Sequence, residues 1–212
     1  MEVIKINFKK IEDEKIKYII KRLKEGKIVI LPTDTSYGMV VNALDNKAIN
    51  EVYKVKKRIE TKPLSIIVKN IAQARKYSII NKRTIKLFNK YLPGKLTIIV
   101  KKKDYLSENL TGGSQLIGLR IPDCRIIEKV IKKVNFPITA TSANISGEKE
   151  PYSVKEILKQ YKNKEKQPDL IVDSGTLTKN KPSTIVDLSE EKIKLIRKGP
   201  INFKDVIKTL KN

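Results

Sequence analysis

Three short polar stretches carry side chains that can bind anions or small polar molecules. They are residues 32–38 (Pro-Thr-Asp-Thr-Ser-Tyr-Gly), residues 56–62 with Lys56, Arg58 and Lys62, and residues 138–147 with Ser142 and Asn144. Hydroxyl and amide groups can hold phosphate or carboxylate oxygens. A lysine near an arginine combines a compact charge with a planar fork, a pairing that suits a triphosphate. The three stretches together predict a site for an anionic substrate.

The first and third stretches are tied to short apolar runs, residues 27–31 and 138–141, which we interpret as buried strands. In open α/β sheets, ligands bind beyond the carboxyl ends of such strands. A plain polar turn also fits the first stretch, and the helix dipole favours cations at a helix end without any function. Ser-x-Asn is a weak pattern by itself. Each stretch alone is therefore open to a purely structural interpretation.

The chain has no histidine and one cysteine, Cys124, among its 212 residues. Ser-His-Asp triads, Cys-His pairs and His-containing zinc sites are therefore excluded. Cys124 fits a structural residue at a helix start better than a nucleophile, because a thiol nucleophile needs a base. A lone thiol also fits a reducing cytosol, so we expect a cytoplasmic protein. Catalysis must use carboxylates, lysine, arginine, hydroxyls, backbone amides or an oxygen-held metal.

The net charge is +23, from 46 basic and 23 acidic residues. Such a field attracts anions, including nucleotides and RNA. Only seven of the basic residues are arginine, and lysine is abundant throughout, so compositional bias explains the charge equally well. No apolar run reaches the roughly 20 residues of a membrane span. We therefore expect a soluble globular protein without a membrane partner.

Strands and helices alternate, which predicts an α/β domain with a mixed, twisted β-sheet flanked by helices and a concave basic face. We expect strands at residues 3–7, 27–31, 64–68, 96–100, 116–120, 138–141, 170–172, 184–187 and 194–196. We expect helices at residues 11–25, 46–57, 71–76, 82–91, 124–133, 154–160 and 204–210. Residues 101–115 and 162–168 are expected to be loops within one domain, residues 1–212. No Walker P-loop or Rossmann glycine fingerprint appears.

Taken in order, these stretches resemble the YrdC/TsaC family of threonylcarbamoyl-adenylate synthases. The matching residues are 31–35, Tyr37, Gly38, Lys56, Arg58, Pro93, Gly94, Leu96, Thr97, 118–122, 142–144, Ser146, Gly147, 183–185, Arg197 and Gly199. The Lys-x-Arg and Ser-x-Asn pair is the functional signature of that family. Since longer members carry a second domain after the region of Arg197, this chain is expected to be the short, single-domain form.

The departures from the family pattern are few. Asp34 stands where the family often has glutamate, and Ile59 where it often has proline. Some members contact threonine through a histidine in the strand after Pro-Leu, where this chain has Ile67. That contact is not carried over to this chain.

The resemblance implies a nucleotidyltransferase that condenses L-threonine, bicarbonate or CO2, and ATP into threonylcarbamoyl-adenylate and pyrophosphate. A carbamate oxygen attacks the α-phosphorus of ATP, which requires charge neutralisation and positioning but no covalent nucleophile. The implied catalytic residues are Lys56, Arg58, Ser142 and Asn144. The implied threonine contacts are Thr33, Thr35, Tyr37 and Arg120, and the implied ATP contacts are Lys56, Arg58, Lys62, Ser142, Asn144, Ser183 and Arg197.

Mg²⁺ is expected to be carried mainly by the ATP phosphates, with no metal ligand from the protein. The product is expected to pass to the tRNA threonylcarbamoyl transferase machinery, with direct RNA contact as a further expectation. Residues 101–115 and 180–183 are expected to close over the ligands. Two alternatives remain: an RNA-binding module without catalysis, and a carbamoyl-transfer domain like that of hydrogenase-maturation proteins. The absence of a cysteine-rich zinc segment argues against the second.

Overall fold

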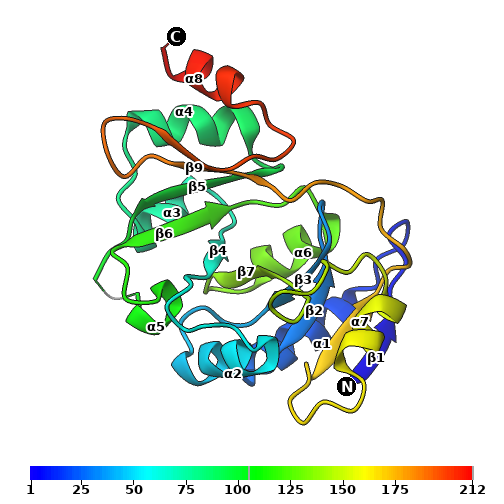
Figure 1. Cartoon of the computed structure of the whole chain (residues 1–212). Helices are drawn as coiled ribbons and strands as arrows, with labels where there is room; N and C mark the ends of the chain where they lie inside the picture. Colours follow the sequence, from blue (N-terminus) through cyan, green and yellow to red (C-terminus); the bar gives the residue numbers. More distant parts are fainter. Residues whose placement is uncertain (105, 212) are drawn as a thin grey trace.

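A computed structural model describes residues 1–104 and 106–211 as a single mixed sheet covered by helices (Figure 1). The ten strands lie in the order β1-β8-β2-β3-β7-β4-β6-β5-β9-β10. They are β1 (Glu2–Lys5), β2 (Val29–Pro32), β3 (Tyr37–Val40), β4 (Ser65–Ile67), β5 (Leu96–Lys101), β6 (Leu116–Arg120), β7 (Ile138–Ser142), β8 (Leu170–Asp173), β9 (Thr184–Asp187) and β10 (Lys194–Arg197). Parallel and antiparallel pairs are both present, so the expected mixed α/β class is confirmed.

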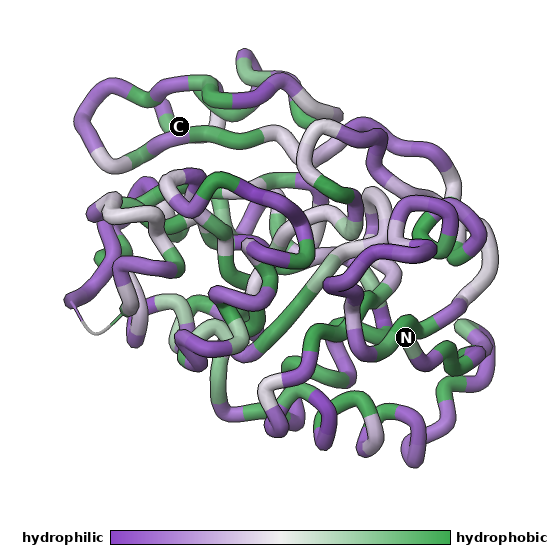
Figure 2. Tube along the Cα trace, turned by 60° about the horizontal axis from the view of Figure 1, so that its bottom comes forward, coloured by the Kyte–Doolittle hydropathy of each residue, from purple (hydrophilic) through white to green (hydrophobic). Residues whose placement is uncertain are grey.

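Helices cover the sheet and enclose two apolar clusters. They are α1 (Asp13–Lys24), α2 (Asn46–Lys56), α3 (Ile71–Tyr77), α4 (Lys82–Tyr91), α5 (Glu108–Thr111), α6 (Arg125–Lys133), α7 (Val154–Tyr161) and α8 (Phe203–Lys211). One cluster joins α1 and α6 to β1, β2 and β8, and the larger one joins α2, α4 and α7 to the sheet. Green hydrophobic positions follow the inner strands in Figure 2, and purple hydrophilic ones dominate the outer loops.

Segments far apart in the sequence pair side by side in this sheet. β1 pairs in parallel with β8, so that Glu2 lies opposite Leu170. β3 pairs with β7, and β5 pairs in parallel with β9. These long-range pairings bring residues from the first, middle and last thirds of the chain to one face of the sheet.

Several expected helix ends are confirmed. The Asp45 carboxylate accepts hydrogen bonds from the backbone N–H groups of Lys47 and Ala48, at 2.9 and 3.1 Å, which caps α2. Gly26 follows α1 with a φ of +72°, a conformation that costs glycine little. Cys124 is the N-terminal cap residue of α6 and is buried, and burial raises the pKa of its thiol. These features fit a structural cysteine.

Two elements differ from the sequence-based expectation. Residues 37–40 form strand β3, whereas the polar stretch 32–38 was expected to leave the sheet. The turn between β2 and β3 closes tightly, because the Thr33 N–H donates to the Ser36 carbonyl at 3.2 Å. Residues 101–115 contain helix α5, which Ser107 caps at 3.1 Å through the N–H of Asn109. Tyr105, within that predicted loop, and Asn212 lie outside the described residues.

The described helices are all too short or too polar to cross a membrane.

Candidate functional site

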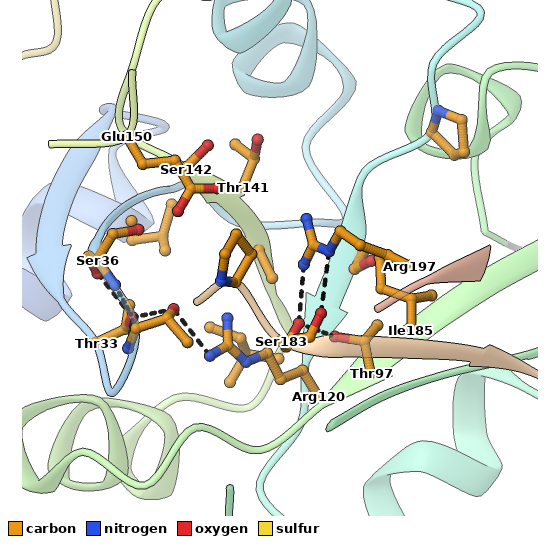
Figure 3. A pocket seen from close by; sticks show the side chains of 18 of the residues that line it. Thr33, Ser36, Thr97, Arg120, Thr141, Ser142, Glu150, Ser183, Ile185 and Arg197 are labelled. Carbon is orange, nitrogen blue, oxygen red and sulfur yellow. Dashed lines mark hydrogen bonds between the residues drawn. The ribbon is translucent and has the colours of Figure 1, made fainter. Parts of the chain in front are cut away.

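A cavity of about 200 Å³ lies against one face of the sheet, and we call it the central cavity (Figure 3). Its floor comes from neighbouring strands: Gly38 and Val40 on β3, Ala140 and Ser142 on β7, Ser65 and Ile67 on β4, Arg120 on β6, Thr97 on β5 and Ile185 on β9. Residues two apart on a strand face the same side, which explains this spacing. The cavity therefore lies over the face of the strands, and not only beyond their carboxyl ends as the sequence suggested.

Small residues make the hollow possible. Gly38, Ser65 and Ala140 occupy floor positions where neighbouring strands carry larger side chains. Gly118, on β6, has no room for a side chain, because an added Cβ would lie 2.3 Å from the Ser65 hydroxyl oxygen. At Gly118, β6 therefore packs closely against the side chain of Ser65 on β4.

The turn between β2 and β3 supplies hydroxyl groups to the cavity. The Thr33 and Thr35 hydroxyl oxygens lie 3.0 Å apart, and the Thr33 hydroxyl donates to the Ser36 carbonyl at 2.7 Å. The Thr35 N–H donates back to the Thr33 hydroxyl at 3.1 Å. This network holds both threonine hydroxyls in place before any ligand arrives, as a binding site requires.

A buried ion pair links this turn to strand β6. Arg120 donates to Asp34 at 2.6 Å, and their side chains are only 12% and 6% exposed. The same guanidinium donates to the Thr35 hydroxyl at 3.1 Å, while its Nε has no partner within the described residues. Burial lowers the pKa of Arg120, and the Asp34 charge opposes that change. Arg120 lines the cavity and is already paired with the opposite charge of Asp34, and its contact with threonine stays a prediction.

Asp34→Asn is expected to lower the free energy of unfolding by about 1–2 kcal/mol, because Arg120 keeps an acceptor but loses its counter-charge. Urea unfolding measures this difference. Asp123→Asn, at an exposed position nearby, is the matched control and should change little. Equal stability of Asp34→Asn and the unchanged protein would contradict the assigned role of the ion pair.

Lys56 lies beneath the turn that follows β7. It is 1% exposed, and its ammonium donates to the carbonyls of Ser142 and Asn144. Burial, and secondarily the charge of Arg58, lowers the pKa of Lys56 to about 7. The Ser142 hydroxyl in turn donates to the Asn144 side-chain oxygen. Lys56 therefore holds the Ser-x-Asn turn from behind, and among these three residues Ser142 is the one that lines the cavity.

Arg58 reaches the cavity from a loop that it helps to close. Its guanidinium donates to the carbonyls of Lys62 and Pro63, at 3.2 and 3.0 Å. The Tyr53 hydroxyl donates to the same Lys62 carbonyl at 3.0 Å. Burial lowers the pKa of Arg58. The loop positions Arg58 at the cavity wall, whereas the side chain of Lys62 is not part of the described lining.

The last strands supply the opposite wall. Arg197 donates to the carbonyl and the hydroxyl of Ser183, each at 3.0 Å, and the Ser183 hydroxyl lies 2.9 Å from that of Thr97 (Figure 3). Burial lowers the pKa of Arg197. The cavity thus brings together three of the seven arginines of the chain, Arg58, Arg120 and Arg197.

Seven predicted site residues line the cavity: Thr33, Thr35, Arg58, Arg120, Ser142, Ser183 and Arg197. Lys56, Asn144, Lys62 and Tyr37 do not appear in that lining. The fully buried Tyr37 points its hydroxyl to the turn after β8, where it donates to the Gly175 carbonyl at 2.7 Å. The predicted roles of these four residues stay predictions, and direct contact is least supported for Tyr37.

Sequence reasoning missed several lining residues. Ser65 and Glu150 line the cavity, but no pattern in their neighbourhood identifies them as ligand-binding, and Thr141 lay in the candidate stretch 138–147 without an assigned role. Thr97 lay in one of the matching stretches without an assigned role. The alternation along β4 would have indicated Ser65 only once the strand order was known, and Thr141 is out of phase with its neighbours Ala140 and Ser142 on β7.

Within the described residues, no group of three His, Cys, Asp or Glu side chains is arranged to hold a metal ion. Glu150 is the one carboxylate in the described lining of the cavity.

Comparison with known proteins adds independent information. The Sua5/YciO/YrdC family model, described as "Telomere recombination", matches residues 21–199. A protein of Methanocaldococcus jannaschii, named provisionally as a threonylcarbamoyl-AMP synthase, is 41% identical over 203 residues, which are 94% of each chain. The threonylcarbamoyl-AMP synthase of Pyrococcus abyssi is 31% identical over 95% of this chain and 58% of that protein.

A solved structure agrees with this similarity. The crystal structure of P. abyssi Sua5 complexed with L-threonine superposes with a TM-score of 0.92 at 30% identity. The match covers 99% of this chain and 61% of that one, so this chain spans less than two thirds of the P. abyssi protein. The chain belongs to the Sua5/YciO/YrdC family.

Proposed function

We propose that this protein is a threonylcarbamoyl-AMP synthase. The observation that carries the proposal is the central cavity, where three arginines converge on a floor of serine and threonine hydroxyls. Relatives with this name align over nearly the whole chain, and one of them was crystallised with L-threonine. These relatives favour an enzyme over an RNA-binding module without catalysis.

The chemistry is a nucleotidyl transfer. L-Threonine, bicarbonate and ATP give threonylcarbamoyl-AMP, pyrophosphate and water. A carbamate oxygen forms a bond to the α-phosphorus of ATP, and the bond from that phosphorus to the pyrophosphate oxygen breaks. The two reacting groups are both anions, so their repulsion must be cancelled and their approach aligned. Basic side chains and hydroxyls suffice for this, which fits a chain without histidine.

The residues of the cavity suit these tasks. Arg58 and Arg197 both line it and would neutralise phosphate oxygens. Thr33, Thr35 and Ser142 would bind the polar groups of threonine and its carbamate. Lys56 would act by fixing the Ser142–Asn144 turn, through its bonds to both carbonyls.

Mg²⁺ would be held mainly by the phosphates and water, since the described residues offer no cluster of metal ligands. When bound, it would lower the negative charge of the triphosphate. We further propose that the protein acts in the cytoplasm and passes its adenylate to the machinery that modifies tRNA.

Residues 101–115 were predicted to close over the ligands. Helix α5, within this segment, already packs with α2, and the Leu64 N–H donates to the Leu110 carbonyl at 2.9 Å. These contacts argue against a large movement of this segment.

The proposal is tested by pyrophosphate release from the purified protein with ATP and Mg²⁺. Release should require both threonine and bicarbonate, and mass spectrometry should detect threonylcarbamoyl-AMP. Omitting either substrate is the control within the same assay. Pyrophosphate release that does not depend on threonine, or no release alongside salt-dependent RNA binding, would overturn the proposal.

A further inference from the structure

An acidic side chain stands in the otherwise basic central cavity. Glu150 follows the Ser-x-Asn stretch and lines the cavity with Arg58, Arg120 and Arg197. Figure 3 shows it next to Ser142 and Thr141, across the cavity from Arg197. Glu150 also borders a second, larger groove that Lys57 and Tyr152 line. Its side chain is half-buried.

The Glu150 carboxylate differs from the other acid near the cavity. Asp34 is committed to Arg120 at 2.6 Å, whereas the side chain of Glu150 forms no ion pair or hydrogen bond within the described residues. The negative charge of Glu150 nonetheless affects two nearby arginines. It opposes the lowering of the pKa by burial at both Arg120 and Arg197. Glu150 is thus an acceptor left available for a ligand.

Nucleotide binding does not explain the presence of a carboxylate in this cavity. Like-charge repulsion between a carboxylate and a triphosphate weakens nucleotide binding. An α-amino acid, in contrast, carries an ammonium group next to its carboxylate. A site for it needs both an anion and a cation, and Glu150 lines the same cavity as Arg120 and Arg197, on which its charge acts.

We propose that Glu150 binds the ammonium group of the amino-acid substrate, and thereby selects an amino acid over other small carboxylates. This inference rests on the proposed function, because it deepens the assignment of threonine as a substrate. Glu150 is a binding and specificity residue for the amino group, and it is not among the residues that match the family pattern.

Glu150→Gln is the direct test, because it removes the charge and keeps the shape. Calorimetry with α,β-methylene-ATP, which cannot react at the α-phosphorus, measures threonine binding without turnover. We expect threonine affinity to fall about 10- to 100-fold, as for loss of a charged hydrogen bond. Affinity for the nucleotide should stay the same or increase, because repulsion is removed. Opposite responses of the two substrates distinguish a lost contact from general damage.

A substrate analogue and a matched variant sharpen the experiment. The unchanged protein should bind threonine more tightly than 2,3-dihydroxybutanoate, in which a hydroxyl replaces the amine. Glu150→Gln should lose this preference. Glu148→Gln, at an exposed position two residues away, should keep it.

The outcomes separate this inference from the proposed function. Absence of threonine binding by the unchanged protein would overturn both. Threonine binding that Glu150→Gln leaves intact would overturn the inference and leave the proposed function standing. An equal loss of affinity for threonine and for the nucleotide in Glu150→Gln would also overturn the inference. So would unchanged threonine affinity together with a raised Mg²⁺ requirement for nucleotide binding, since Glu150 would then act on the nucleotide or its metal.

Discussion

Arg58→Ala should slow threonylcarbamoyl-AMP synthesis by about 10³-fold, because positioned arginines supply rate factors of this size in phosphoryl and nucleotidyl transfer. Arg58 faces the cavity and is fixed by the carbonyls of Lys62 and Pro63. Its guanidinium can therefore meet charge that develops on the phosphate without first being ordered. The measurement is the kcat for threonine-dependent pyrophosphate release, where a transition-state contact is seen.

Two variants make this result interpretable. Arg58→Lys keeps a charge but loses the planar fork, so it should recover only part of the lost rate. Arg75→Ala, at an exposed position of α3 outside the cavity, should retain full activity. The folded state of each variant can be checked by urea unfolding. Full activity in a folded Arg58→Ala protein would show that Arg58 has no part in the chemistry.

Lys56→Ala should lower the free energy of unfolding by about 3–5 kcal/mol, since it leaves two buried carbonyls without a donor and opens a cavity in the interior. Lys56 is 1% exposed, and those carbonyls belong to Ser142 and Asn144. Lys56→Met fills most of the volume, so it should cost less. Loss of synthesis in a stably folded Lys56→Met protein would then show that the donor, and not the volume, holds the Ser-x-Asn turn.

The pH dependence of stability tests the environment of Lys56 separately. Burial and the Arg58 charge lower its pKa from an ordinary 10.5 to about 7. Between these values the unfolded chain binds a proton that the folded chain has lost, so stability rises with pH in this window. The unchanged protein should therefore gain stability relative to Lys56→Met from pH 7 to pH 10.5. A difference that stays constant over this range would mean that Lys56 keeps an ordinary pKa in the fold.

Local patterns predicted most of the fold. Apolar spacing located the described helices other than α5 to within one or two residues. Strand β3 was missed because Tyr37 and Gly38 look like a continuation of the polar turn. Their strand conformation is decided by pairing with β2 and β7, which lie on either side. Because β7 is about 100 residues away in the sequence, its pairing with β3 cannot be recognised from the residues around Tyr37.

The sequence predicted only part of the candidate site, because the rest depends on contacts between residues that are far apart in the sequence. Short motifs identified Arg58, after a predicted helix, together with Ser142 and Arg197, at or near strand ends, and the cavity does bring these three residues together. They could not show that Lys56 lies behind the turn, because its direction depends on contacts with Ser142 and Asn144, which are far away in the sequence. Ser65 and Glu150 carry no motif at all. Their place in the cavity follows from the strand order and from the path of the chain after Asn144.

The pairing of β1 with β8 has a consequence for how the chain folds during its synthesis. β8 stands between β1 and β2 in the sheet, so Glu2–Lys5 must wait for Leu170–Asp173 to leave the ribosome before its hydrogen bonds form. At about 5–20 residues per second, that delay is roughly 10–30 s. An unpaired strand is open to wrong partners over this interval. The polar ends of β1, Glu2 and Lys5, limit such contacts until its own partner arrives.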